Sequence, residues 1–303
     1  MDKIKKVYID SRYKSSDSVS NSDFKFEINE SLDLPDNTYC YIDDICIPHS
    51  WYTVEDFNNT FYIVVKRWIH YGSTYAAPRY HGYALKLANG NYTGLSIATE
   101  IQEILQTSIS DKEFTCSYNT STGKLTIKGG TDEMFKVLSD MQVSSIDPAL
   151  PEPWMGWKDN NDIAISLDVS NLQSINEVFR NASESTWSPM EPLVNEFTTE
   201  FLDLLNVHNI YIHSSTLGHY NSIGVRGENT IIKKVPVSSS FGYLIMDSVV
   251  APHDKINVSK QLIKTLHFSL KNVHGNVINL HGAHMSLSLI FRSVLSASEG
   301  KIR

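Results

Sequence analysis

The last long stretch of the chain, residues 266–292, constrains the fold more than any other part of the sequence. Apolar residues occupy every second position from Leu266 to Leu270, and the same alternation returns from Met285 to Phe291. A period of two places each apolar set on one face of a β-strand. Glycine and asparagine residues, which tolerate turn conformations, separate the two runs. The stretch therefore predicts two paired or neighbouring strands whose apolar faces need a second sheet to cover them.

Length and charge limit what this stretch can belong to. The chain has 303 residues, 41% of them hydrophobic, enough for one large or two ordinary domains. Its formal net charge is −8, and phosphate binding needs clustered lysine and arginine, so we expect no direct nucleic-acid binding. The N-terminus lacks the apolar core of a signal peptide, and no apolar run is long enough for a membrane span. We expect a soluble protein made in a reducing compartment.

The three cysteines, Cys40, Cys46 and Cys116, form no zinc-binding pattern. Cys40 and Cys46 lie six residues apart in one extended segment, which places their Cα atoms about 20 Å apart. That distance is too long for a disulfide bond. We therefore expect no disulfide between them.

Strand signals are frequent before residue 70. Residues 24–28 alternate between apolar and polar side chains, as a half-buried strand does. In the extended run 38–48, four apolar side chains share one phase, and Asp43 and Ile42 interrupt the two faces. The phased residues are Tyr39, Tyr41, Ile45 and Ile47. The continuous apolar run 61–65 predicts a strand that is covered on both sides.

The middle of the chain mixes helix and strand signals. Residues 95–107 carry apolar side chains at helical spacing, with Thr93 as the expected N-cap. A hairpin is predicted from 114–119 and 124–129 around a turn that ends at Gly123. Residues 132–141 predict a short second helix, with acidic residues at its start.

Strand signals resume after Asn206, at 207–214, 229–237 and 241–250, before the final pair. With the early strands this gives about eight, the number in a two-sheet jelly roll, and such a sandwich would pair early strands with late ones. We predict a mainly β protein: an eight-stranded antiparallel single jelly roll formed by residues 1–74 and 207–303. Residues 75–206 are predicted to form an inserted α+β domain, with an extension of the same sandwich as the alternative.

No group of side chains predicts a catalytic site, and we expect neither enzymatic activity nor a cofactor. Eight of the eleven histidines follow residue 206, yet His281 and His284 differ in strand parity and have no nearby carboxylate, which disfavours a metal site. The carboxylates Asp43–Asp44 and Asp17/Asp23 lack the repeating pattern of a calcium loop, so solvated side chains are the better interpretation. Gly224–Glu228 predicts a turn.

Three tryptophans, Trp154, Trp157 and Trp187, lie in a proline-rich, loop-like region and are expected to be exposed. Tryptophan stacks on sugars in lectin sites, but it is also enriched at the centres of protein interfaces. We favour interface or packing roles, and sugar binding stays open as the alternative.

Three segments resemble the penton (minor capsid) proteins of mavirus-type virophages and Polinton (Maverick) elements. They are the N-terminal run at 8–59, the helix-opening GNYTGLSIATEIQEIL at 90–105 and the closing KNVHGNVINLHGAHMSLSLIF at 271–291. The resemblance implies a vertical single jelly roll with an inserted outer domain. It also implies a homopentamer at each five-fold vertex of an icosahedral capsid, surrounded by trimers of a major capsid protein.

The expected function is therefore that of a structural virion protein at the capsid vertices, assembled in the host cytoplasm. Its expected partners are other copies of itself and the major capsid protein. The polar face at His267, Ser269 and Lys271 is then a candidate subunit contact. The alternative function is host attachment by a carbohydrate-binding jelly-roll protein that uses the inserted domain.

Overall fold

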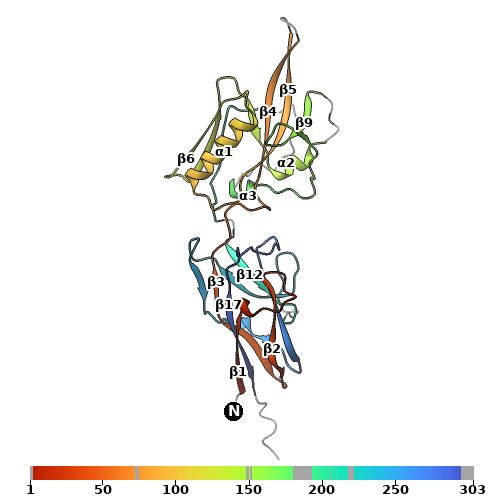
Figure 1. The fold of residues 1–303 in the computed structure, drawn as a ribbon, viewed down its shortest axis with the longest axis vertical. Helices are drawn as coiled ribbons and strands as arrows, with labels where there is room; N and C mark the ends of the chain where they lie inside the picture. Colours follow the sequence, from red (N-terminus) through yellow and green to blue (C-terminus); the bar gives the residue numbers. More distant parts are fainter. Residues whose placement is uncertain are drawn as a thin grey trace, which may run out of the picture. The chain divides into compact units, whose positions relative to one another are not determined.

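The structure is a computed structural model that describes residues 3–71, 75–147, 150, 152–179, 193–205, 207–217 and 222–294. It is mainly β, with mostly antiparallel pairing. The chain forms two compact units. We call Met1–Trp51 with Val207–Arg303 the sandwich unit, and Tyr52–Asn206 the inserted unit. Strands from both ends of the chain, red and blue in Figure 1, lie together in the sandwich unit.

Two sheets form the sandwich unit. The first has the order β1-β17-β3-β14, with β15 also paired to β3: β1 (Lys3–Asp10), β17 (Ser286–Ser293), β3 (Thr38–Pro48), β14 (Leu244–Asp247) and β15 (Ile256–Asn257). The second has the order β13-β12-β16-β2: β13 (Ile231–Pro236), β12 (Asn209–His213), β16 (Leu262–Lys271) and β2 (Asp23–Asp33). Two short 3-10 helices, Ser11–Tyr13 and Pro252–Asp254, complete the unit.

Early strands pair with late ones, as the sequence predicted. β17 lies between β1 and β3, and β16 pairs with β2, all antiparallel. The strands expected after Asn206 form β12, β13 and β14. Neither end of the chain can complete a sheet without the other, so both sheets close only when the distant segments meet.

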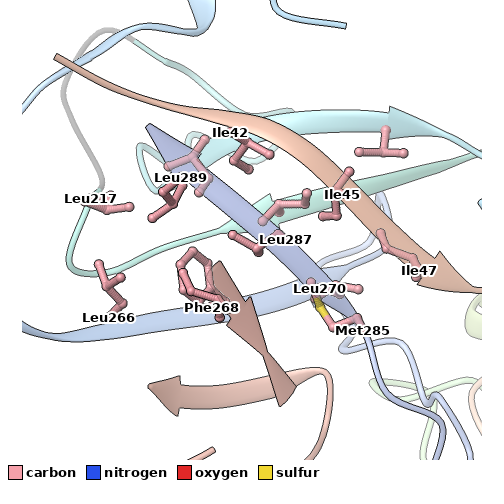
Figure 2. Packing of buried hydrophobic residues seen from close by; sticks show 14 of the residues in the cluster. Ile42, Ile45, Ile47, Leu217, Leu266, Phe268, Leu270, Met285, Leu287 and Leu289 are labelled. Atoms are coloured by element: carbon pink, nitrogen blue, oxygen red, sulfur yellow. The ribbon is translucent and has the colours of Figure 1, made fainter. Parts of the chain in front are cut away.

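The expected pairing of the last two strands is wrong, because β16 and β17 belong to different sheets. Their apolar side chains meet across the core instead, where Leu266 and Phe268 of β16 lie opposite Leu287 and Leu289 of β17 (Figure 2). The connection between them turns at Gly275, whose φ is +82°. The two strands therefore cover each other, and the early strands extend the two sheets sideways.

A β-bulge explains the broken alternation in β3. Leu289 of β17 pairs with Ile42 and Ser288 pairs with Asp44, so Asp43 is the extra residue. The bulge reverses the parity, and the buried side chains are Cys40, Ile42, Ile45 and Ile47. The expected phase of Tyr39 and Tyr41 is wrong for this reason, because both point away from the core before the bulge.

The inserted unit contains two further sheets and three helices. The larger sheet has the order β10-β9-β5-β4-β8: β10 (Ala164–Ile165), β9 (Trp154–Lys158), β5 (Tyr75–Lys86), β4 (Thr60–Tyr71) and β8 (Phe135–Val137). The smaller has the order β11-β7-β6: β11 (Glu196–Thr198), β7 (Lys124–Gly129) and β6 (Phe114–Asn119). The helices are α1 (Gly94–Ser108), α2 (Asp140–Ser145) and α3 (Asn176–Phe179). These sheets enclose their own cores, so the region does not extend the sandwich.

The run 61–65 is covered on both sides, which confirms the prediction for this strand. Phe61, Ile63 and Val65 of β4 enter one core, together with α1 and the smaller sheet. Tyr62 and Val64 enter the other core, beside the tryptophans of β9. β4 is thus the centre of the inserted unit.

The first helix and the hairpin are confirmed. Thr93 caps α1 through a reciprocal capping box with Ser96, and β6 pairs with β7 around Gly123. The second helix is wrong at 132–139, because Phe135 and Val137 alternate as a strand that pairs with β4. The helix α2 begins only after Ser139, its N-cap.

The expected boundary at 74/75 falls inside the pairing of β4 with β5. Those two strands are in register from Thr60–Lys86 to Tyr71–Tyr75. A boundary there would separate two paired strands of one sheet, and the structure instead divides between Trp51 and Tyr52.

Candidate assembly surface

The strand β14 forms one open edge of the first sheet. In the described part of the chain its strand partner is β3 alone. Ile245 points into the core, while Leu244 and Met246 point outward from the same strand. An unpaired edge strand with apolar side chains is a template for contact with another protein.

The residues around β14 expose an unusual amount of apolar surface. Tyr243 is 70% exposed, Leu244 57%, Met246 74% and Val249 73%. Single exposed apolar residues are common, but a contiguous group marks an interaction site. We call residues 241–250 the apolar edge; its exposed large side chains are Phe241, Tyr243, Leu244, Met246, Val249 and Val250.

The apolar edge is fixed to the second sheet by Lys233 of β13. The Lys233 side chain is 4% exposed, and its Nζ lies 3.5 Å from Asp247 Oδ1. The same Nζ donates a hydrogen bond of 2.7 Å to the carbonyl oxygen of Val249. A buried, paired lysine is costly to disturb, so the edge is held in position before any partner binds.

The opposite edge of the same sheet has a different character. β1 carries exposed Lys3 and Lys5 with exposed Ile4 and Tyr8. A groove of about 470 Å³ lies beside it, and its lining residues are Tyr8, Ile9, Asp10, Tyr13, Phe26, Glu27, Asn29, Asp44, Ser286 and Leu287. The sheet thus ends in one apolar edge and one mixed, partly basic edge.

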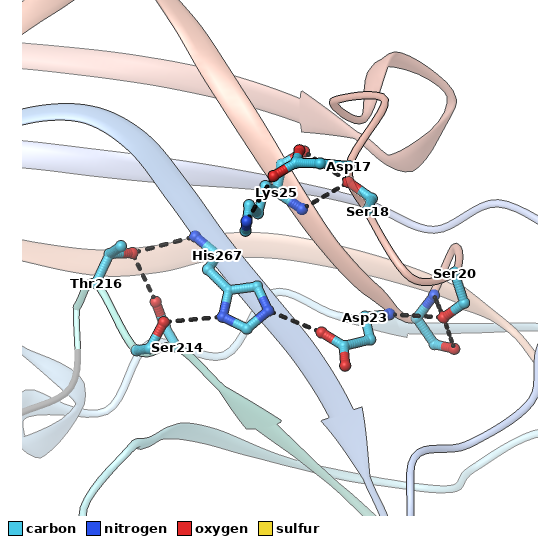
Figure 3. A network of polar contacts seen from close by, with 10 residues as sticks. Asp17, Ser18, Ser20, Asp23, Lys25, Ser214, Thr216 and His267 are labelled. Carbon is cyan, nitrogen blue, oxygen red and sulfur yellow. Dashed lines mark hydrogen bonds and ion pairs between the residues drawn. The ribbon is translucent and has the colours of Figure 1, made fainter.

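The polar face of β16 is not a free surface. His267 Nε2 lies 2.7 Å from Asp23 Oδ1, and His267 Nδ1 lies 2.8 Å from Ser215 Oγ. The backbone N–H of His267 also donates to Thr216 Oγ1 (Figure 3). Ser269 is buried. The expected subunit contact is corrected here, because β2 on one side and the 214–217 turn on the other occupy this face.

The acidic residues weighed as a possible site have separate partners. Lys6 Nζ lies 2.7 Å from Asp43 and 3.4 Å from Asp44, beside the bulge. Asp17 pairs with Lys25 (Figure 3), and this hydrogen bond lowers the pKa of the Asp17 carboxyl. Asp44 also accepts a hydrogen bond from Ser288. These contacts join neighbouring strands and loops.

The histidines also make local contacts. His281 Nδ1 lies 2.6 Å from the carbonyl oxygen of Ser50, and His284 Nδ1 lies 3.4 Å from Ser11 Oγ. No group of three or more potential metal ligands occurs within the described ranges. Gly224–Glu228 is a turn, as predicted, with Gly227 at a φ of +84°.

The expected exposure of Trp154 and Trp157 is wrong. They are 4% and 6% exposed, and their ring centroids lie 5.5 Å apart in an edge-to-face contact. Both pack over Gly82 of β5, which leaves the space that a side chain would fill. Trp187 lies outside the described residues. The two described tryptophans are core residues and have no face for a sugar.

The cysteines are free, as expected, and burial raises the pKa of each thiol. For Cys116 the pKa rises to about 12. Within the described residues, no helix has the length and apolar character needed to cross a membrane.

The sequence signal for the apolar edge was present but incomplete. The run 241–250 predicted a strand, and the structure confirms one there. Its exposure could not be read from the run itself, because consecutive apolar residues are more typical of a buried strand. Only the sheet order shows that the strand is last in its sheet.

Comparison with known proteins gives one fold relationship. No protein-family model matches the chain, and no curated protein matches it in sequence. Among solved structures, the chain is similar to the crystal structure of the mavirus penton protein, with a TM-score of 0.50 and 12% sequence identity. The likeness covers 97% of this chain and 100% of that protein. At this identity the two are distinct proteins, and what they share is a fold over their whole lengths.

Proposed function

We propose that this chain is a structural capsid protein of the penton type, whose role is self-assembly at the five-fold vertices of an icosahedral virion. The observation that carries the proposal is the full-length fold likeness to the mavirus penton protein, with the inserted unit between β3 and β12. The sequence resemblance in three segments supports the same role.

The strand order supports a single eight-stranded jelly roll for the sandwich unit. Taken along the chain, β1, β3, β14 and β17 belong to one sheet, while β2, β12, β13 and β16 belong to the other. The orders β1-β17-β3-β14 and β13-β12-β16-β2 are those of two interlocked Greek keys. The short strand β15 is an addition to this arrangement. Jelly rolls occur in viral capsids as well as in lectins, so the strand order alone does not select the function.

The two edges of the first sheet suit a ring. A ring needs a head-to-tail interface, in which one surface of each copy contacts a different surface of the next. The apolar edge at β14 and the mixed edge at β1 are two such surfaces on opposite sides of one sheet. In this proposal the apolar edge contacts a neighbouring copy, and trimers of a major capsid protein surround the ring.

The proposal assigns no catalysis and no cofactor to the chain. It places the protein in the virion, with other copies and the major capsid protein as partners, and it needs no contact with the genome. The alternative, host attachment through the tryptophans, is not supported at Trp154 or Trp157 because both are buried.

The test is the assembly state of the purified chain, alone and with the major capsid protein, measured by native mass spectrometry and electron microscopy. We expect five-membered rings, formed by the chain itself or on joining capsids. A chain that stays monomeric and never enters capsids would contradict the proposal.

A double substitution tests the apolar edge within this proposal. Leu244→Asp with Met246→Asp places two charges on the contact and should weaken the ring at least roughly a hundredfold, since each lost apolar contact is worth ~1.5–3 kcal/mol. Val19→Asp, at a side chain that is also highly exposed but outside the edge, should assemble normally. If the double variant assembles like the wild type, the contact lies elsewhere.

A further inference from the structure

We propose that the inserted unit carries a binding site for a neutral saccharide in a pocket above β4 and β5, away from the buried tryptophans. The inference does not depend on the proposed assembly function. It rests on the pocket's floor, its rigid rim and the uncommitted amide groups of its wall.

The floor of the pocket is formed by two adjacent strands. Tyr62 of β4 is in register with Ala84 of β5, and Thr60 is in register with Lys86. All four line a cavity of about 540 Å³, a volume in the range of small-molecule sites. The ring of Tyr62 packs edge-to-face on Trp157 below, so the floor is fixed and partly apolar. Such a floor suits the C–H face of a sugar.

The rim is held to the sheet by several hydrogen bonds. Asn160 clamps the backbone of Lys86 with both ends of its amide: Oδ1 accepts from the N–H at 2.8 Å, and Nδ2 donates to the carbonyl at 2.9 Å. Asp162 accepts from Tyr83 Oη and pairs with Lys158. On the other side, the backbone of Gln173 accepts a hydrogen bond from Thr60. The rim is therefore organised before a ligand enters.

The wall offers polar groups that the protein itself does not use. Within the described residues, the side chains of Asn161, Ser166, Asn171 and Gln173 have no hydrogen-bond partner, and all four line the pocket. An amide offers both donors and acceptors, and a hydroxyl does the same. This combination matches a ligand whose surface consists of hydroxyl groups.

The charges of the pocket favour a neutral ligand. Asp159 and Asp168 line it with a single cation, Lys86. One lysine beside two carboxylates is a poor site for a phosphate or a sialic acid, because clustered cations are what anions need. A largely apolar ligand would bury the amides without partners, which costs free energy. A neutral mono- or oligosaccharide satisfies the floor and the wall together.

The test uses the full-length protein on a printed array of neutral and sialylated glycans, followed by titration of the strongest neutral glycan. We expect binding to neutral glycans in preference to sialylated ones. The double variant Asn171→Ala with Gln173→Ala should lose at least roughly tenfold in affinity, because each lost hydrogen bond contributes a few-fold. Ser166→Arg, at the exposed rim, should block the pocket.

Matched controls separate binding from folding and from assembly. Gln261→Ala changes an exposed side chain in the sandwich unit and should bind as the wild type does, and every variant should keep the wild-type unfolding temperature and oligomeric state. The proposal is overturned if no neutral glycan binds, if sialylated glycans bind best, or if the double variant and Ser166→Arg both bind normally. None of these results would alter the assembly proposal.

Discussion

At the scale of single residues, the inserted unit depends on positions that leave space or withhold charge. Gly82 is one of them: a Cβ there would lie 2.6 Å from Trp157 Cε3 and 2.7 Å from the Trp154 ring. Real Cβ atoms do not approach carbon so closely, and rigid indole rings packed in a core cannot move away cheaply. The glycine is thus what allows both tryptophans to pack on the sheet.

Gly82→Ala should destabilise the inserted unit by about 1–3 kcal/mol, the usual cost of overpacking a core. Gly90→Ala is the matched control, because the added Cβ would make only ordinary contacts, at 3.6 Å or more. Urea unfolding followed by tryptophan fluorescence measures both. Equal stability of the two variants would show that the indoles can shift.

His81 is the second such position, a buried histidine on β5 whose Nδ1 lacks a partner among the described residues. Burial, reinforced by the positive charges of Lys158 and Arg67, lowers the pKa of His81 to about 4. In the unfolded chain a histidine has a pKa near 6.5, so the unfolded state binds more protons between these values. Stability that is present above pH 6.5 is therefore lost as the pH falls toward 4.

Replacing this histidine should flatten that dependence. The unfolding temperature of His81→Gln should fall less than that of the wild type between pH 7 and pH 5. His253→Gln, at an exposed side chain in the sandwich unit, should follow the wild type. Parallel curves for His81→Gln and the wild type would mean that His81 does not titrate in this range.

At the scale of elements, the bulge in β3 shows how one residue sets which side chains are buried. Asp43 has no partner in the β17 ladder, and its parity change keeps Ile42 and Ile45 on the same face. Without the extra residue, the alternation from Cys40 to Ile47 would be regular. The bulge is therefore neutral for the core, and its local contact is the exposed ion pair with Lys6.

Deleting Asp43 should leave the sandwich unit folded, with a loss of at most about 1 kcal/mol from the exposed ion pair. Deleting Tyr41 instead should be severe, because a shift of one residue turns one half of the strand inside out. Thermal unfolding followed by circular dichroism compares the two deletions. Similar unfolding temperatures would contradict the assigned register.

At the scale of the whole molecule, the chain consists of two units with separate cores. The sandwich unit needs both ends of the chain, whereas the inserted unit is continuous in sequence. Continuous units with their own core can fold alone. The inserted unit should therefore be independent of the strands that flank it.

Residues 52–206, expressed alone, should give a cooperatively folded protein, measured by thermal unfolding and by dispersed amide signals in NMR spectra. Residues 75–206 form the matched control. That fragment lacks β4, which supplies Phe61, Ile63 and Val65 to the core, and it should not fold. A folded 75–206 fragment would show that β4 is dispensable.

The sequence by itself determined the elements whose signals are local. The helix α1 with its cap at Thr93, the hairpin of β6 and β7, and the doubly buried run 61–65 follow from periodicity, capping and turn chemistry within a few residues. It also indicated that early and late strands pair, because the apolar faces at both ends needed partners. A strand signal marked the apolar edge, and polar residues marked the rim of the pocket.

Only the tertiary structure decided which surfaces face each other. β16 and β17 cover one another from opposite sheets, β14 is the last strand of its sheet, and Trp154 and Trp157 are core residues over Gly82. Each outcome depends on contacts between residues far apart in the chain. A period of two states that a strand has an apolar face, but it cannot state which strand lies beside it or opposite it, because register and sheet order are fixed by packing across the whole core.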